Sequence, residues 1–252
     1  MCTNNNLNKA RKIKNDEYYT LMEDIEKELE HYDFTNKIVY CKTDTEDSNF
    51  VKYFKTRTEI KELIYSSYDF RSDEAIENLK RCDVVVTNPP FSLIKEYIPM
   101  LFEYKKDFLI VAPMQSFTYS YIFPYFKDNI INVGYNQIKN FNTKDGIKSL
   151  ANVYWMTTLK VDDKPFFYSG TKFNDRKYEK YSNYDAIEIK RLKDLPDDYN
   201  EVMGVTPTIL LKYNRKQFEL IGVRQGLFYI HGKCVFLRIL LKRVKLNATK
   251  HS

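Results

Sequence analysis

The chain has 252 residues, of which 43% are hydrophobic and 15% aromatic, so it can bury the core of one large domain and is not an intrinsically disordered protein. Its apolar runs are strand-sized and its start is rich in Asn and Lys, so we expect neither a membrane span nor a signal peptide. Four scattered cysteines and three distant histidines predict a reduced, cytoplasmic protein without a metal site.

The positive charge is concentrated at the C-terminal end. The formal net charge is +6, but residues 203–252 contain ten Lys or Arg and one acid, and the rest of the chain is net negative. Such a basic end is typical of a contact with a phosphate backbone. A solvated surface that only aids solubility explains the same pattern equally well. The candidate DNA contacts are Lys212, Arg215, Lys216, Arg224 and Arg238.

Strands and helices are predicted to alternate along the first half of the chain. Leu21, Ile25 and Leu29 recur every four residues and predict a helix that Asn15 caps. Serines precede two later helical segments, and Pro99 is expected to kink the last one. The predicted helices are 16–32, 48–55, 72–79 and 92–104, and the predicted strands are 37–41, 62–66, 83–87 and 108–112.

This alternation predicts an α/β sheet with right-handed crossovers. The first glycine is Gly134, which excludes a glycine-rich phosphate loop in the N-terminal half. Beyond about residue 130 short strands replace the pattern, and we expect them at 152–159, 186–190, 218–223, 227–230 and 235–242. The resulting division is a larger α/β domain over 12–160 and a smaller, basic, β-rich region over 161–252.

The sharpest motif is Asn88-Pro89-Pro90-Phe91, which follows the continuous apolar run Asp83–Thr87. Ligands of open α/β sheets bind where such buried strands end. An Asn side-chain oxygen and a backbone carbonyl can accept both hydrogens of an aromatic amine, and proline holds the loop stiff without adding a donor. Phe91 can stack on a base that has left the duplex. The same four residues are also ordinary turn chemistry that merely ends a strand.

Residues 82–97 (CDVVVTNPPFSLIKEY) resemble the EcoRI-type adenine-specific DNA methyltransferase family. Further similar blocks run from about residue 15 to about residue 243, including NDEYYTL at 15–21 and KYNRKQFELIG at 212–222. The resemblance implies a Rossmann-like methyltransferase sheet that uses S-adenosylmethionine, followed by a target-recognition region for double-stranded DNA. It also implies methylation of N6 of a flipped-out adenine, within or derived from a restriction–modification system.

The same resemblance assigns the site residues. Asn88, Pro89, Pro90 and Phe91 would form the catalytic loop. The cofactor-binding residues that it implies are Tyr18, Tyr19 and Thr20 near the methionine end, Cys41 and Asp44 in place of a glycine-rich turn, and Asp69 and Phe70 beside the adenine. Between Ile64 and Asp69 the chain is shorter than the family pattern. We expect a monomer, with a cognate restriction endonuclease as a possible partner.

Other functions fit parts of the same pattern. The tetrapeptide also serves methylation of RNA adenine or of a protein glutamine, and the missing glycine turn would suit a non-catalytic DNA-binding relic. Glu188-Ile189-Lys190 has the E-x-K form of metal-dependent nucleases, with Asp175 and Asp185 upstream. Strand-like alternation explains that triplet instead as a solvent-facing pair, and Asp44 could equally lie in a solvated acidic loop.

Overall fold

The computed structural model describes residues 18–42, 44–224 and 228–244, and these residues form two compact units. The first unit contains residues 18–117 and 128–161. The second contains residues 118–127 and the described residues from 162 onward. In the described ranges, no helix combines the length and the apolar character needed to cross a membrane.

The first unit is built on a seven-stranded sheet with the order β1-β6-β7-β5-β4-β2-β3. Strands β3, β2, β4 and β5 are parallel, whereas β7, β6 and β1 are added in antiparallel pairing. The predicted α/β sheet is thus confirmed. The strands are β1 (Tyr19–Thr20), β2 (Ile38–Lys42), β3 (Glu62–Ser66), β4 (Val84–Thr87), β5 (Asp107–Pro113), β6 (Asn132–Thr143) and β7 (Gly146–Thr157).

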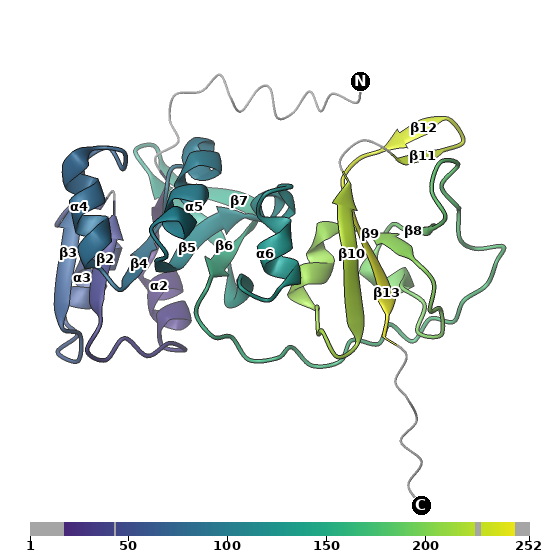
Figure 1. Cartoon of the computed structure of the whole chain (residues 1–252), viewed down its shortest axis with the longest axis horizontal. Helices are drawn as coiled ribbons and strands as arrows, with labels where there is room; N and C mark the ends of the chain where they lie inside the picture. The colour runs from purple at the N-terminus through teal and green to yellow at the C-terminus, as the bar shows by residue number, and fades with distance from the viewer. Residues whose placement is uncertain (1–17, 43, 225–227, 245–252) are drawn as a thin grey trace, which may run out of the picture. The chain divides into compact units, whose positions relative to one another are not determined.

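Helices cover both faces of this sheet (Figure 1). Val39 and Val84 face the helices α2 and α3, with which they share one apolar core. The alternate residues Tyr40 and Lys42 face the opposite side, where Lys42 contacts Tyr97 on α5. The helices of this unit are α2 (Met22–Leu29), α3 (Asn49–Lys55), α4 (Asp73–Arg81) and α5 (Ile94–Glu103), with short 3-10 turns η1 (Phe91–Leu93) and η2 (Met114–Thr118).

The ends of the helices follow local sequence at two places and depart from it at a third. The Ser48 hydroxyl accepts a hydrogen bond from the Val51 amide, and the Ser72 hydroxyl accepts one from the Ala75 amide, as the predicted caps require. The helix expected from residue 16 is wrong at its start, because α2 begins only at Met22 and Tyr19–Thr20 form a strand that pairs with β6. The proposed cap Asn15 lies outside the described residues.

The second unit contains a four-stranded sheet with the order β10-β13-β9-β8 and a separate β11–β12 hairpin. The single strand expected at 235–242 is wrong, because the chain breaks at Leu237, which has a positive φ of 43°. The elements are α6 (Phe123–Lys127), β8 (Ile187–Ile189), η3 (Leu192–Asp194), β9 (Met203–Val205), η4 (Pro207–Leu211), β10 (Phe218–Arg224), β11 (Phe228–Ile230), β12 (Lys233–Val235) and β13 (Arg238–Arg243).

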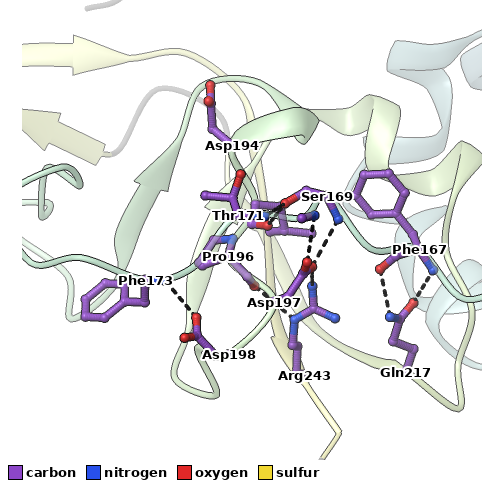
Figure 2. Close-up of polar contacts among 12 residues, drawn as sticks. Phe167, Ser169, Thr171, Phe173, Asp194, Pro196, Asp197, Asp198, Gln217 and Arg243 are labelled. Atoms are coloured by element: carbon purple, nitrogen blue, oxygen red, sulfur yellow. Dashed lines mark hydrogen bonds and ion pairs between the residues drawn. The ribbon is translucent and has the colours of Figure 1, made fainter.

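A buried arginine on β13 ties the irregular part of the second unit to its sheet (Figure 2). The Arg243 guanidinium donates to the Pro196 carbonyl at 3.0 Å and to the Asp197 carboxylate at 2.7 Å. Asp197 in turn accepts the backbone amides of Ser169 and Gly170. Long loops are thereby fixed by charge-assisted hydrogen bonds where regular secondary structure is sparse.

In the first unit, the fully buried carboxylate of Glu28 joins α2 to β6. Its oxygens accept the backbone amides of Tyr135 at 2.9 Å and Asn136 at 2.8 Å, and the Tyr32 hydroxyl at 2.8 Å. A Cβ atom at Gly134 would collide with this carboxylate, so only glycine allows the close approach. The anchor matters for the site because β6 also carries the residues that pair with β1.

We predict that Glu28→Gln lowers the free energy of unfolding by about 2–3 kcal/mol, because the amide nitrogen of Gln faces amide donors that need an acceptor. Chemical denaturation of the purified chain measures this change. The exposed Glu26, on the same helix, provides the control, since Glu26→Gln should change stability by less than about 0.5 kcal/mol. Equal effects of the two substitutions would contradict the anchoring role.

Candidate active site

A pocket of about 340 Å³ lies in the first unit, beside the carboxyl ends of β2 and β4. It brings together eight residues that the sequence singled out, and four that it did not. The predicted residues are Tyr18, Tyr19, Thr20, Asp44, Asn88, Pro89, Pro90 and Phe91. The additional lining residues are Thr45, Ser48, Asn49 and Phe50.

The loop after β4 is oriented by one hydrogen bond. The Nδ2 atom of Asn88 donates to the Tyr18 carbonyl at 2.6 Å. An amide has a donor end and an acceptor end, so this bond turns the Oδ1 atom of Asn88 away from Tyr18. Among the described residues, no partner occupies that oxygen, and Asn88 itself is half-buried at the wall of the pocket.

Aromatic rings fix the other end of the loop. The Phe91 ring stacks on the Tyr18 ring with a centroid separation of 5.8 Å and an interplanar angle of 20°. Both rings also meet the fully buried Phe141 of β6 edge-on, at 5.8 Å from Tyr18 and 6.2 Å from Phe91. Such offset and edge contacts add stability beyond burial alone, so the loop is held on a rigid frame.

The wall formed by β1 carries a polar group without a partner. Thr20 is 3% exposed, and its Oγ1 atom has no hydrogen-bond partner among the described residues. Its carbonyl, by contrast, accepts a hydrogen bond from the Asn49 Nδ2 atom at 2.9 Å. A buried hydroxyl without a partner costs free energy, and a polar ligand in the pocket would supply the missing hydrogen bond.

Asp44 contributes a carboxylate to the same pocket. Thr87 Oγ1 lies 2.6 Å from Asp44 Oδ2 and 2.7 Å from the Lys42 carbonyl oxygen. One hydroxyl proton can serve only one of these acceptors. Burial raises the pKa of Asp44 to about 6, although hydrogen bonds from Thr87 and Ser48 act in the opposite direction. Asp44 is therefore not part of a solvated acidic loop, whereas its neighbours Glu46 and Asp47 are exposed.

Three of the expected cofactor residues do not line this pocket. Cys41 is fully buried in the core, and burial raises the pKa of its thiol well above the usual value. Phe70 is also buried, against the Tyr97 ring at 5.3 Å. Asp69 is exposed and bound by Arg71, whose hydrogen bonds lower the pKa of the Asp69 carboxyl to about 2.

A buried lysine lies on the other face of the sheet, close to Phe70. Lys42 Nζ is within 6 Å of the ring centroids of Tyr40, Phe70 and Tyr97 and lies 3.8 Å from the Met100 sulfur. Burial lowers the pKa of Lys42 to about 8. Cation–π attraction offsets part of the cost of burying this charge, so Lys42 belongs to the structural frame of the site.

The cations proposed for DNA contact have different surroundings in the second unit. Arg215 and Lys216 lie 3.8 Å and 3.0 Å from Asp163, and Lys212 is exposed. Arg224 is exposed, with its guanidinium 5.4 Å from the centroid of the Tyr184 ring. The fifth proposed cation, Arg238 on β13, forms an ion pair with the buried Glu188.

That ion pair corrects the interpretation of Glu188 as a solvent-facing residue. Glu188 is 5% exposed, and its carboxylate is bound by the Arg238 guanidinium at 2.6 Å and by the Tyr181 hydroxyl. Lys190, two residues further along, is exposed and pairs with Glu179. In the described part of the chain, no group of three or more His, Cys, Asp or Glu side chains is placed to hold a metal ion. In the E-x-K triplet, Glu188 therefore belongs to a buried ion pair with Arg238, and Lys190 belongs to a surface ion pair with Glu179.

Comparison with known proteins gives consistent matches. The profile of a family described as "Adenine-specific methyltransferase EcoRI" matches residues 6–69 and 57–251. The chain is 37% identical to Type II methyltransferase M.EcoRI of Escherichia coli, over 97% of this chain and 98% of that protein. It is 35% identical to Type II methyltransferase M.MgeORF184P of Mycoplasma genitalium and 34% identical to Type II methyltransferase M.MpnI of Mycoplasma pneumoniae, in each case over 85% of this chain and 84% of the relative. No solved structure matches the chain significantly.

The comparison also bears on the shortened segment before Asp69. The alignment with the Escherichia coli protein extends over 323 positions, so that protein has segments that the 252 residues of this chain lack. The two profile matches overlap at residues 57–69, which is consistent with a break in the alignment there. In the structure, β3 forms the edge of the sheet and only residues 67–72 connect it to α4.

We predict that Asp44→Asn makes the free energy of unfolding less dependent on pH between about 4 and 6. The folded-state pKa of Asp44 is raised, so the folded chain binds more protons than the unfolded chain in this window, and stability falls as the pH rises through it. Above pH 7 the ionised carboxylate costs about 3 kcal/mol, which the Asn variant recovers in part. Denaturation curves at several pH values measure the difference, with the exposed Asp47→Asn as the control. A stability difference between Asp44→Asn and the wild type that stays constant from pH 4 to pH 8 would contradict the raised pKa.

Proposed function

This chain belongs to the family of EcoRI-type adenine-specific methyltransferases, and on that premise we propose that it transfers a methyl group from S-adenosylmethionine to N6 of an adenine in duplex DNA. The observation that carries the proposal is the oriented amide of Asn88 at the wall of a pocket. The three relatives are named type II methyltransferases, which supports a role within a restriction–modification system that has a cognate endonuclease.

The pocket fits a methyl donor in size and in chemistry. Its volume of about 340 Å³ lies in the range of small-molecule sites. The unpartnered Thr20 hydroxyl and the Asp44 carboxylate offer hydrogen bonds to polar groups of the donor, and Tyr18 and Phe50 offer apolar surface. When bound, S-adenosylmethionine supplies an electrophilic methyl group. Asp69 and Phe70, which do not line this pocket, stay proposed contacts of its adenine end.

The loop after β4 would activate the target amine. The lone pair of an aromatic amine is delocalised into the ring, so the nitrogen is a poor nucleophile. Asn88 Oδ1 and a backbone carbonyl of the Asn88–Pro90 segment accept the two amine hydrogens, which draws the nitrogen towards tetrahedral geometry. The nitrogen would then form the new bond to the methyl carbon while the bond from that carbon to the sulfonium sulfur breaks, with its electron pair staying on the sulfur. The nitrogen's proton would leave to solvent afterwards, so no strong base is required. Fixed acceptors of this kind stabilise developing positive charge without reorganising.

Phe91 would hold the extruded base. Its ring lines the pocket, and the stack on Tyr18 fixes its orientation. A base that leaves the duplex loses its stacking partners, and an aromatic ring restores part of that energy. The assembled pocket favours an active enzyme over a relic. The basic end of the chain favours a nucleic acid over a protein glutamine as the substrate.

In the same proposal, residues 12–160 carry out the methyl transfer and residues 161–252 recognise the target sequence. Lys212, Arg215, Lys216 and Arg224 are exposed on the second unit and stay its proposed phosphate contacts. Arg238 would act indirectly, by supporting the backbone of β13 through its bonds to Glu188.

Transfer of a labelled methyl group tests the function directly. The purified chain is incubated with tritiated S-adenosylmethionine and duplex DNA of varied sequence, and the product is digested to nucleosides. Label in N6-methyl-2′-deoxyadenosine supports the proposal. Label only in a structured RNA competitor, or in no nucleic acid at all, contradicts it.

We predict that Asn88→Ala reduces the rate of methyl transfer by at least a hundredfold, because one of the two amine acceptors is lost. Calorimetry should show that the affinity for S-adenosylmethionine changes little, since other residues hold the donor. Asn200→Ala, at an exposed position of the second unit, is the matched control and should retain full activity. Full activity of Asn88→Ala would show that the Asn88 side chain has no role in the transfer.

A further inference from the structure

The β6–β7 hairpin extends beyond β5, its neighbour on the β7 side. Strand β7 pairs with β5 only from Val153 to Thr157, whereas its pairing with β6 continues to the Thr143–Gly146 end. Residues 139–151 therefore form an arm, and most of them are exposed. In Figure 1 this hairpin is drawn in teal and carries the labels β6 and β7.

The middle of the arm touches the loop that follows β4. Phe141 is fully buried and lies 6.2 Å from Phe91 between ring centroids. On its edge, Phe141 and Asn142 pair with β1, whose residues line the pocket. The position of the arm is thus fixed relative to the pocket by contacts within one unit.

The arm is basic. Residues 139–151 read KNFNTKDGIKSLA, with three lysines and one acid. Lys148 is directly opposite Phe141 in the ladder, so the two side chains share a face. Accordingly, Lys148 Nζ lies 3.0 Å from the Tyr18 hydroxyl and 5.1 Å from the centroid of the Tyr18 ring, close to the stack that includes Phe91.

We propose that this arm binds the phosphate backbone of duplex DNA next to the extruded nucleotide, with Lys148 and Lys144 as the phosphate contacts. The inference rests on the proposed function, because an extruded base in the pocket brings its flanking phosphates to the rim where Lys148 lies. Positive charge beside the pocket complements that backbone. An exposed strand edge that carries lysines also resists pairing with other chains, so the arm stays available for the duplex.

The test uses the full chain and a fluorescent duplex, with binding measured by anisotropy from 50 to 200 mM salt. Each phosphate contact contributes about 0.9 to the slope of log affinity against log salt. We expect Lys144→Met/Lys148→Met to reduce the slope by about 2 and to weaken binding roughly tenfold per lysine near 0.1 M salt. Lys144→Met alone, which leaves the contact with Tyr18 intact, should reduce the slope by about 1.

A matched control removes the same number of positive charges at the amino ends of the strands, away from the pocket. Lys37 and Lys61 are exposed and precede the amino ends of β2 and β3, and Lys37→Met/Lys61→Met should leave the slope unchanged. Affinity for S-adenosylmethionine should be equal in the wild type, in Lys144→Met and in the Lys37→Met/Lys61→Met control. If the arm variants keep the wild-type slope, or if the control variant loses as much slope as they do, the arm does not bind the phosphate backbone. The proposed function still stands in that case, provided that the wild type methylates DNA. Absence of DNA labelling by the wild type overturns both.

Discussion

A single hydrogen bond, from the Asn88 side-chain amide to the Tyr18 carbonyl, links the two walls of the pocket and decides which end of the amide remains available. The Tyr18 carbonyl can serve as a fixed reference because the next residues, Tyr19–Thr20, are paired with β6. Strand β6 returns to the loop through Phe141, which packs against Phe91. The loop, β1 and β6 therefore form a closed set of contacts that fixes the orientation of the Asn88 Oδ1 atom.

Two polar groups of the pocket are unfavourable for the stability of the fold. Thr20 keeps a buried hydroxyl without a partner, and Asp44 keeps a carboxylate whose pKa is raised by burial. Each of these costs free energy in the folded chain, which is typical of sites whose groups bind or react. The Glu28 anchor and the aromatic contacts of Tyr18 stabilise the surrounding structure and offset this cost.

Features that depend on neighbouring residues were predicted correctly from the sequence. The Ser48 and Ser72 caps and the strand at 62–66 follow from neighbouring residues, and the structure confirms them. Long-range pairing determined the rest. Tyr19–Thr20 lie within the helix predicted for 16–32 but form a strand because β6 lies beside them. Glu188 alternates like a surface residue but is buried because Arg238, fifty positions away, binds it. Asn49 reaches the pocket through the Thr20 carbonyl, a contact that no spacing in the sequence reveals.

The proposed mechanism requires that one pocket holds the methyl donor beside the amide that accepts the target amine. A crystal structure of the chain with S-adenosylhomocysteine, the demethylated donor, is the sharpest test of this arrangement. We expect density for the ligand between the Tyr18–Thr20 segment and Asn88, with its sulfur facing the Asn88 oxygen. Density for the ligand elsewhere, with this pocket filled only by water, would show that the donor binds at another site.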